Sequence, residues 1–151
     1  MDKIDIAILN SMQRDDTLSV AQVAEKVSIS KTACWRRIQK LTISQVITHR
    51  VALLNPRAVN LPLAVFISVR TNQHNDEWVQ QFKAVVATLP QILEVYRMSG
   101  DLDYLLKAVV TDMPDYDKLY KQLIRANIFD VSSSFVMEEL KYQTQLPLDH
   151  L

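Results

Sequence analysis

The stretch SVAQVAEKVSISKTACWRRIQKL, residues 19–41, decides the fold of the N-terminal third of this 151-residue chain. Its first four residues, Ser19 to Gln22, fit the S-x-x-Q capping box that starts a helix. Ser28 and Ile29 then form a tight turn, and Ser30 is placed to cap a second helix. Apolar residues at helical spacing give each helix a buried stripe: Val20, Val23, Ala24 and Val27 in the first, and Cys34, Ile38 and Leu41 in the second. Two short helices joined by so short a turn predict a helix-turn-helix.

The outer face of the second helix carries residue types that suit double-stranded DNA. Arg can donate two hydrogen bonds to guanine, while Lys and Thr suit phosphates and mixed base edges. Trp35 either braces the helix or touches the phosphate backbone. The candidate DNA-binding residues are Ser30, Lys31, Thr32, Trp35, Arg36, Arg37 and Lys40, with His49 and Arg50 beyond the helix. The alternative is a three-helix subdomain whose arginines are merely solvated.

The distribution of charge favours a polyanionic partner. The formal net charge is zero, but residues 1–50 carry eight Lys/Arg and five Asp/Glu, while residues 51–151 carry nine and twelve. No acidic residue occurs between Glu25 and Asp76. A basic N-terminal module beside an acidic remainder is typical of nucleic-acid binding.

Segments on both sides complete the N-terminal domain. A helix from about Lys3 to Gln13 begins at Asp2, with apolar residues on one face. The alternating run Val46–Leu54 predicts a wing strand or hairpin, with His49 and Arg50 near its tip. We therefore expect a winged helix-turn-helix domain over residues 1–50, and a wing strand and linker over residues 51–62.

Residues 63–151 predict the order β-α-β-β-α-β. The expected strands are Leu63–Thr71, Ile92–Ser99, Asp103–Thr111 and Val131–Leu140, and the expected helices follow the Asn75 cap and cover Asp115–Arg125. This order gives a four-stranded sheet with helices on one face, the ferredoxin-like α+β arrangement. Since the other face is also rich in Val, Ile, Leu and Phe, we expect a second copy of the chain to cover it in a homodimer.

Composition excludes several classes of protein. The single glycine, Gly100, cannot build a Gly-rich phosphate loop, and the single cysteine, Cys34, allows no intrachain disulfide or cysteine-based zinc cluster. The three histidines are far apart, so we expect no metal and no cofactor. The longest apolar stretch, near Pro62–Val69, is too short to span a membrane, and the N-terminus does not resemble a signal peptide. We therefore expect a cytoplasmic protein that does not bind membranes.

Four ordered motifs make the chain resemble the Lrp/AsnC family of transcriptional regulators. They are D-x-x-D-x-x-I-L at residues 2–9, S-x-T-x-C-W-R-R-I at 30–38, S-G-D-x-D-Y-L-L-K at 99–107 and S-F-V-M-E-E-L-K at 134–141. The sequence is most similar to DecR-like, cysteine-responsive members, through Cys34–Arg36, Arg97–Met98 and Tyr142–Pro147. The resemblance implies a DNA-binding domain fused to an amino-acid-binding and oligomerisation domain, with dimers assembling into octamers. Members usually carry glycine where this chain has Ser28 and Gln45, and proline where it has Lys31.

The resemblance also implies an effector site at the Gly100 turn. A glycine turn offers amide donors to a carboxylate, and aspartates suit an ammonium group. The candidate effector-binding residues are Met98, Ser99, Gly100, Asp101, Asp103 and Tyr104, with Ser133, Ser134, Phe135 and Val136 contributed by the same or a neighbouring chain. The alternative is a plain hairpin turn with solvated aspartates.

The functional expectation is a sequence-specific DNA-binding regulator that responds to a small amino acid, such as cysteine or another sulfur-containing or apolar one. It is not an enzyme, since no nucleophile, base and orienting group occur at readable spacing. The alternative is a small ferredoxin-like enzyme with an appended nucleic-acid-binding module.

Overall fold

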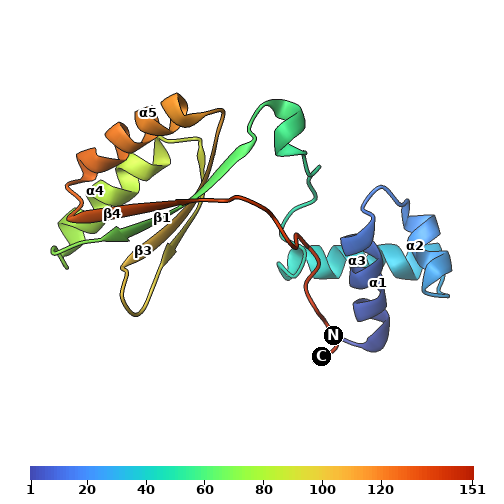
Figure 1. Cartoon of the computed structure of the whole chain (residues 1–151). Coiled ribbons are helices and arrows are strands. Elements are labelled where there is room, and N and C mark those ends of the chain that lie inside the picture. Colours follow the sequence, from blue (N-terminus) through green and yellow to red (C-terminus); the bar gives the residue numbers. More distant parts are fainter. The chain divides into compact units, whose positions relative to one another are not determined.

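Three helices, each capped by a side chain, form the first part of the chain in the computed structural model, which describes residues 1–151 (Figure 1). They are α1 (Lys3–Arg14), α2 (Val20–Lys26) and α3 (Lys31–Ile43). Asp2 and Ser19 close reciprocal capping boxes at α1 and α2, and Ser30 accepts a hydrogen bond from the amide of Ala33 at the start of α3. The predicted helix-turn-helix is confirmed.

The core of this helical unit is apolar and draws on all three helices. Its fully buried members include Ile8 of α1 and Cys34 of α3. The buried set is Ile8, Leu9, Val23, Ala24, Cys34, Ile38 and Leu41. It contains all three residues that the sequence places on the inner side of α3.

Two turns of the helical unit hold residues with a side chain in the left-handed region. Ser28 has φ 56° and Gln45 has φ 58°. At both positions the family resemblance leads us to expect glycine. A residue with a Cβ in this conformation lowers the free energy of unfolding relative to glycine. The turns nevertheless keep the geometry that a glycine would favour.

The wing strand expected over Val46–Leu54 is wrong. Beyond α3 the chain holds no strand before β1 (Leu63–Arg70), and a short 3-10 helix, η1 (Pro56–Val59), follows. An alternating pattern becomes a strand only when a neighbouring strand takes up its backbone hydrogen bonds. No other segment pairs with residues 46–54, and Val51, Leu53 and Leu54 are all exposed.

The last segment of the chain packs with the helical unit. The chain divides into two compact units, Met1–Ala52 with Leu140–Leu151, and Leu53–Glu139. The Gln13 amide donates to the carbonyl of Leu146 at 3.3 Å and accepts from its N–H at 2.7 Å. Leu148 packs against the helical core. The sequence predicts a domain over residues 63–151 and a last strand over Val131–Leu140, whereas the last strand ends at Phe135 and the tail beyond Leu140 packs with the helices.

The second unit is a four-stranded antiparallel sheet with helices on one face. The strands are β1 (Leu63–Arg70), β2 (Ile92–Arg97), β3 (Tyr104–Val110) and β4 (Asp130–Phe135), in the order β2-β3-β1-β4. The helices α4 (Asp76–Ala87) and α5 (Met113–Leu123) lie along the sheet, and a 3-10 turn, η2 (Ile124–Ala126), follows α5 (Figure 1). This confirms the ferredoxin-like prediction.

Aromatic side chains fill the space between sheet and helices. Trp78 stacks on Phe82 at 5.1 Å between ring centroids, and both contact Tyr104 of β3. The Trp78 indole N–H donates to the carbonyl of Asn127 at 3.1 Å. Alternate β1 residues Val65, Ile67 and Val69 are fully buried against the same layer. No helix of the chain is both long and apolar enough to cross a membrane.

Candidate DNA-binding and effector sites

The outward face of α3 presents most of the predicted DNA-binding residues to solvent. Lys31, Thr32, Trp35, Arg36 and Lys40 are all exposed, Trp35 at 53% of its surface. A large apolar side chain left exposed beside cations suits contact with a base or a sugar. The basic outer face predicted for α3 is therefore present.

Gln39, which was not among the predicted DNA-binding residues, lies on this same face. It is exposed, and it follows Trp35 by four residues and Arg36 by three, the spacing of helical neighbours. A Gln side chain can pair with both adenine N6 and N7 in the major groove. The helical spacing that selected Arg36 could have selected Gln39 as well.

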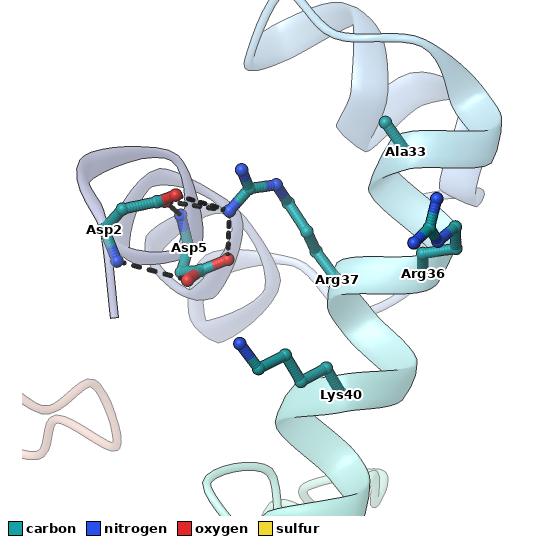
Figure 2. Close-up of a pocket in the computed structure, with 6 residues that line it drawn as sticks. All are labelled: Asp2, Asp5, Ala33, Arg36, Arg37 and Lys40. Carbon is teal, nitrogen blue, oxygen red and sulfur yellow. Dashed lines mark hydrogen bonds and ion pairs between the residues drawn. The ribbon is translucent and has the colours of Figure 1, made fainter.

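Two of the predicted DNA-binding arginines already have partners within the chain. Arg37 Nη1 donates to Asp2 Oδ1 and Oδ2 at 2.9 and 2.8 Å, and to Asp5 Oδ1 at 2.7 Å (Figure 2). Arg50 Nε donates to both carboxylate oxygens of Asp16 at 2.8 Å. Neither arginine is free, unlike Arg36. His49 is exposed.

A hollow of about 530 Å³ lies between the start of α1 and α3. Its walls are Asp2, Asp5, Ala33, Arg36, Arg37 and Lys40 (Figure 2). Arg37 reaches across it to the carboxylates, whereas Arg36 extends away from them. The hollow therefore carries acidic side chains on one wall and basic ones on the other.

Protonation follows from these contacts. The Asp5 amide and the Arg37 guanidinium hold the pKa of Asp2 below its ordinary value, and Asp5 and Asp2 raise the pKa of Arg37. A carboxyl group whose pKa is lower in the folded than in the unfolded state stabilises the fold at pH values above its unfolded-state pKa. This stabilisation is lost as the pH falls through the folded-state pKa. Burial raises the pKa of the Cys34 thiol, so Cys34 acts here as a small apolar core residue.

The predicted effector turn forms the tip of the β2–β3 hairpin. Gly100 has φ +112°, a conformation that side-chain-bearing residues rarely adopt, and a Cβ there would meet no atom within 4 Å. Asp103 Oδ2 accepts from the Thr71 amide at 2.8 Å, so this carboxylate is partly engaged. The exposed Asp101 accepts from Arg70 Nε through its backbone carbonyl at 2.7 Å, and its carboxylate makes no hydrogen bond or ion pair within the chain.

The other predicted effector residues lie elsewhere on the sheet. Met98 and Ser99 share the exposed tip, but Tyr104 is buried in the aromatic core. Val131 pairs with Val69, next to the hairpin, whereas Phe135 pairs with Val65, about 13 Å further along the strand. Within one chain the hairpin and the residues Ser133, Ser134, Phe135 and Val136 therefore do not form one cluster.

The β4 residues also divide between the two faces of the sheet. Ser133 hydrogen bonds to the Tyr116 hydroxyl, and Phe135 packs edge-on against the Tyr116 ring, both on the helix side. Ser134 pairs with Phe66 on the opposite face.

Arg70 at the end of β1 was not among the predicted effector residues either. Besides holding the hairpin carbonyl, its Nη1 lies 3.3 Å from Asp130 Oδ2 at the start of β4. It therefore links the Gly100 turn to the strand that carries the remaining candidates. No sequence signal marks Arg70, because only strand order brings residues 70, 101 and 130 together.

The sheet face opposite the helices is uncovered in the single chain and mixes apolar with charged groups. Phe66 is 38% exposed at the centre of β1. Beside it, Lys107 lies 3.3 Å from Glu94, which also accepts from the Tyr96 hydroxyl. The Tyr96 and Lys107 contacts hold the pKa of Glu94 below its usual value. No group of three His, Cys, Asp or Glu side chains comes close enough to hold a metal ion.

Comparisons with known proteins match both units. The description of the AsnC-type helix-turn-helix domain fits residues 1–42, and that of the Lrp/AsnC ligand binding domain fits residues 64–146. The DNA-binding transcriptional activator DecR of Escherichia coli (strain K12) is 40% identical over 151 residues, covering 99% of each chain.

Two crystal structures agree along the whole chain. An AsnC family transcriptional regulator from Agrobacterium tumefaciens is 52% identical, with a TM-score of 0.95 over 100% of this chain and 99% of that one. A transcriptional regulator of Neisseria meningitidis in complex with L-methionine is 34% identical, with a TM-score of 0.94 over 99% and 98%.

Proposed function

The chain belongs to the Lrp/AsnC family of transcriptional regulators, and from this premise we propose which of its residues carry the function. In the proposal, α3 enters the major groove of an operator, and the hairpin around Gly100 binds an amino acid. Two copies pair through the uncovered sheet face, so that their α3 helices meet half-sites about one helical turn apart.

The observation that supports the DNA-binding part is the exposed face of α3. Its free cations, Lys31, Arg36 and Lys40, lie beside Thr32, Trp35 and Gln39 on an otherwise unoccupied helix surface. Arg36 is the residue best placed to read guanine, because no carboxylate of the chain engages its guanidinium. Ser30 serves this face by capping the helix, and His49 contributes at its edge.

Replacing Arg36 by alanine should weaken binding to the operator by about ten- to hundredfold, the cost of losing one bidentate base contact. Fluorescence anisotropy with a duplex selected by the wild-type protein from a random-sequence pool measures the affinity. Arg125→Ala is the matched control, since Arg125 is an exposed arginine of the sheet unit with no ion pair. Equal affinity of Arg36→Ala and wild type would remove Arg36 from the site, and absence of any salt-dependent duplex binding would remove the DNA-binding proposal itself.

The effector is an amino acid, and the hairpin supplies the groups that its backbone needs. The Asp101 carboxylate suits the ammonium group, and Arg70 with the amides beside Gly100 suits the carboxylate. The L-methionine in the Neisseria meningitidis regulator supports a sulfur-containing or apolar amino acid. The proposed contacts are Met98, Ser99, Gly100, Asp101 and Asp103, with β4 residues Ser133, Ser134, Phe135 and Val136 supplied by a second copy of the chain.

Tyr104 takes a different place in the proposal. Because its ring is buried against Trp78 and Phe82, it supports the hairpin from beneath.

Replacing Gly100 by alanine should abolish the stabilisation by ligand while leaving the fold and its oligomeric state intact. The added methyl group would meet no atom within 4 Å, so the substitution acts through the backbone, which must leave φ +112°. A ligand at a hundred times its Kd raises the stability of wild type by about 2.7 kcal/mol, which thermal unfolding with L-methionine, L-cysteine and L-leucine detects.

Asn60→Ala is the control for backbone strain alone, since Asn60 adopts φ 60° at the end of η1, outside the hairpin. A Gly100→Ala protein that still gains stability with the amino acid that stabilises wild type would contradict the effector site.

Assembly and location complete the proposal. Pairing through the sheet gives a homodimer, and dimers join into an octamer, as the family resemblance implies. A DNA-binding regulator of this kind works in the cytoplasm. No feature of the chain favours the enzyme alternative, and the regulators compared above are transcription factors.

A further inference from the structure

We propose that Arg37 is a positioning residue, which fixes the orientation of α3 on α1 and makes no contact with DNA. The inference rests on the proposed function, because it concerns how α3 meets the major groove. It separates Arg37 from its neighbours Arg36 and Lys40, which the sequence alone groups together.

The side chains of Arg37 and Arg36 extend in different directions. Arg37 follows Arg36 by one residue, which turns its side chain by about 100° around the helix. Figure 2 shows the result: Arg37 reaches the start of α1, whereas Arg36 extends away from the two carboxylates. The Arg37 side chain is 31% exposed and borders the inner side of α3.

The Asp5 carboxylate is buried and depends on Arg37 for its charge partner. Asp5 is buried to 9% exposure, and its side chain already accepts from the Asp2 amide at 3.1 Å as part of the capping box. A buried carboxylate needs a paired cation, and Arg37 is the one that contacts it. If Arg37 turned to a phosphate, Asp5 would be left unpaired.

The two carboxylates also neutralise the positive charge of Arg37. Arg37 lies between two carboxylates, and the Asp2–Asp5–Arg37 cluster carries a net charge of −1, so the Arg37 charge is already balanced, whereas Arg36 and Lys40 on the same wall have no carboxylate partner. The cluster instead joins residues 32 and 35 positions apart. It ties the first turn of α1 to the middle of α3, at a point separate from the apolar core around Ile8 and Cys34.

The atoms used in the cluster allow a sharp test. All three hydrogen bonds come from one guanidinium nitrogen, Nη1. A Lys ammonium has three donors and can replace that single nitrogen, whereas Met fills similar space without charge. We expect Arg37→Met to bind the operator about ten- to hundredfold more weakly, the cost of a misplaced base contact, and Arg37→Lys to restore most of the affinity.

Salt dependence distinguishes positioning from phosphate contact. Each phosphate contact contributes about −0.9 to the slope of log K against log [salt]. Arg37→Met should keep the wild-type slope despite its weaker binding, whereas Lys40→Met should reduce the slope by about one unit. The probe is the duplex selected from a random-sequence pool, titrated at several salt concentrations.

Asp5→Asn should change the DNA affinity in the direction opposite to that expected from charge alone. Removing a negative charge beside DNA should strengthen binding if the cluster has no positioning role, and we expect it to weaken binding. Circular dichroism establishes that each variant is folded. If Arg37→Met does not fold, the affinity of Asp5→Asn tests the positioning role instead.

An Arg37→Met slope reduced by one unit, or affinities of Arg37→Met and Asp5→Asn at or above wild type, would overturn the inference. Failure of the wild-type protein to bind any duplex would instead overturn the proposed function.

Discussion

A Phe66→Glu variant is expected to be monomeric and to bind its operator roughly 10²- to 10⁴-fold more weakly than wild type. Phe66 lies at the centre of the uncovered sheet face, where it pairs with Lys107 on β3 and Ser134 on β4. A carboxylate at the centre of the proposed dimer interface would compete with Glu94 for the single neighbouring cation, Lys107, so one of the two carboxylates would be buried without a partner. The monomer then loses the second recognition helix, and with it the gain from binding two half-sites.

Light scattering measures the mass of this variant, and anisotropy with the selected duplex measures its affinity. Ile124→Glu is the matched control, because Ile124 is 41% exposed, close to the 38% of Phe66, but follows α5 in the helical layer. We expect Ile124→Glu to keep the mass of the wild-type assembly and to bind normally. A dimeric Phe66→Glu would show that the sheet face is not the interface.

Replacing Trp78 by alanine should lower the free energy of unfolding of the sheet unit by about 3–5 kcal/mol. Trp78 is 2% exposed and contacts Phe82, Tyr104 and the Asn127 carbonyl, so its removal leaves a cavity and an unpaired backbone acceptor. Because Tyr104 directly follows the hairpin, the response to an amino acid should weaken as well.

Trp78→Phe separates the two contributions to this loss. It keeps much of the ring volume and removes the indole N–H, so it should cost clearly less than Trp78→Ala. Urea unfolding monitored by circular dichroism gives both values. A loss below about 1 kcal/mol for Trp78→Ala would contradict the packing described for α4.

Local signals in the sequence predicted the helical elements well. The caps at Asp2, Ser19 and Ser30 act within three residues of themselves, so the sequence around each one suffices. The same holds for the strands of the sheet, whose alternation reflects burial against one layer. The helix-turn-helix and the ferredoxin-like order can therefore be predicted from the sequence alone.

Features that depend on contacts between distant parts of the chain could not be predicted from the sequence. Arg37 and Arg36 are adjacent and chemically identical, and only the arrival of α1 distinguishes them. Alternation at Val46–Leu54 predicted a strand, but alternation does not supply the partner that a strand requires. The hairpin and the β4 candidates separate because the strand register places them at different levels of the sheet, and the pairing of distant strands cannot be read from local sequence patterns.

The tail that Gln13 holds has a consequence for how the protein is made. Leu148, which completes the apolar packing of the DNA-binding helices, is synthesised after the whole sheet unit. The helix-turn-helix leaves the ribosome first, yet its packing stays incomplete until residues 146–148 have followed. A chain that still lacks residues 146–148 would therefore carry a less stable helix-turn-helix, so the stability of the first unit to be synthesised depends on the last residues to be added.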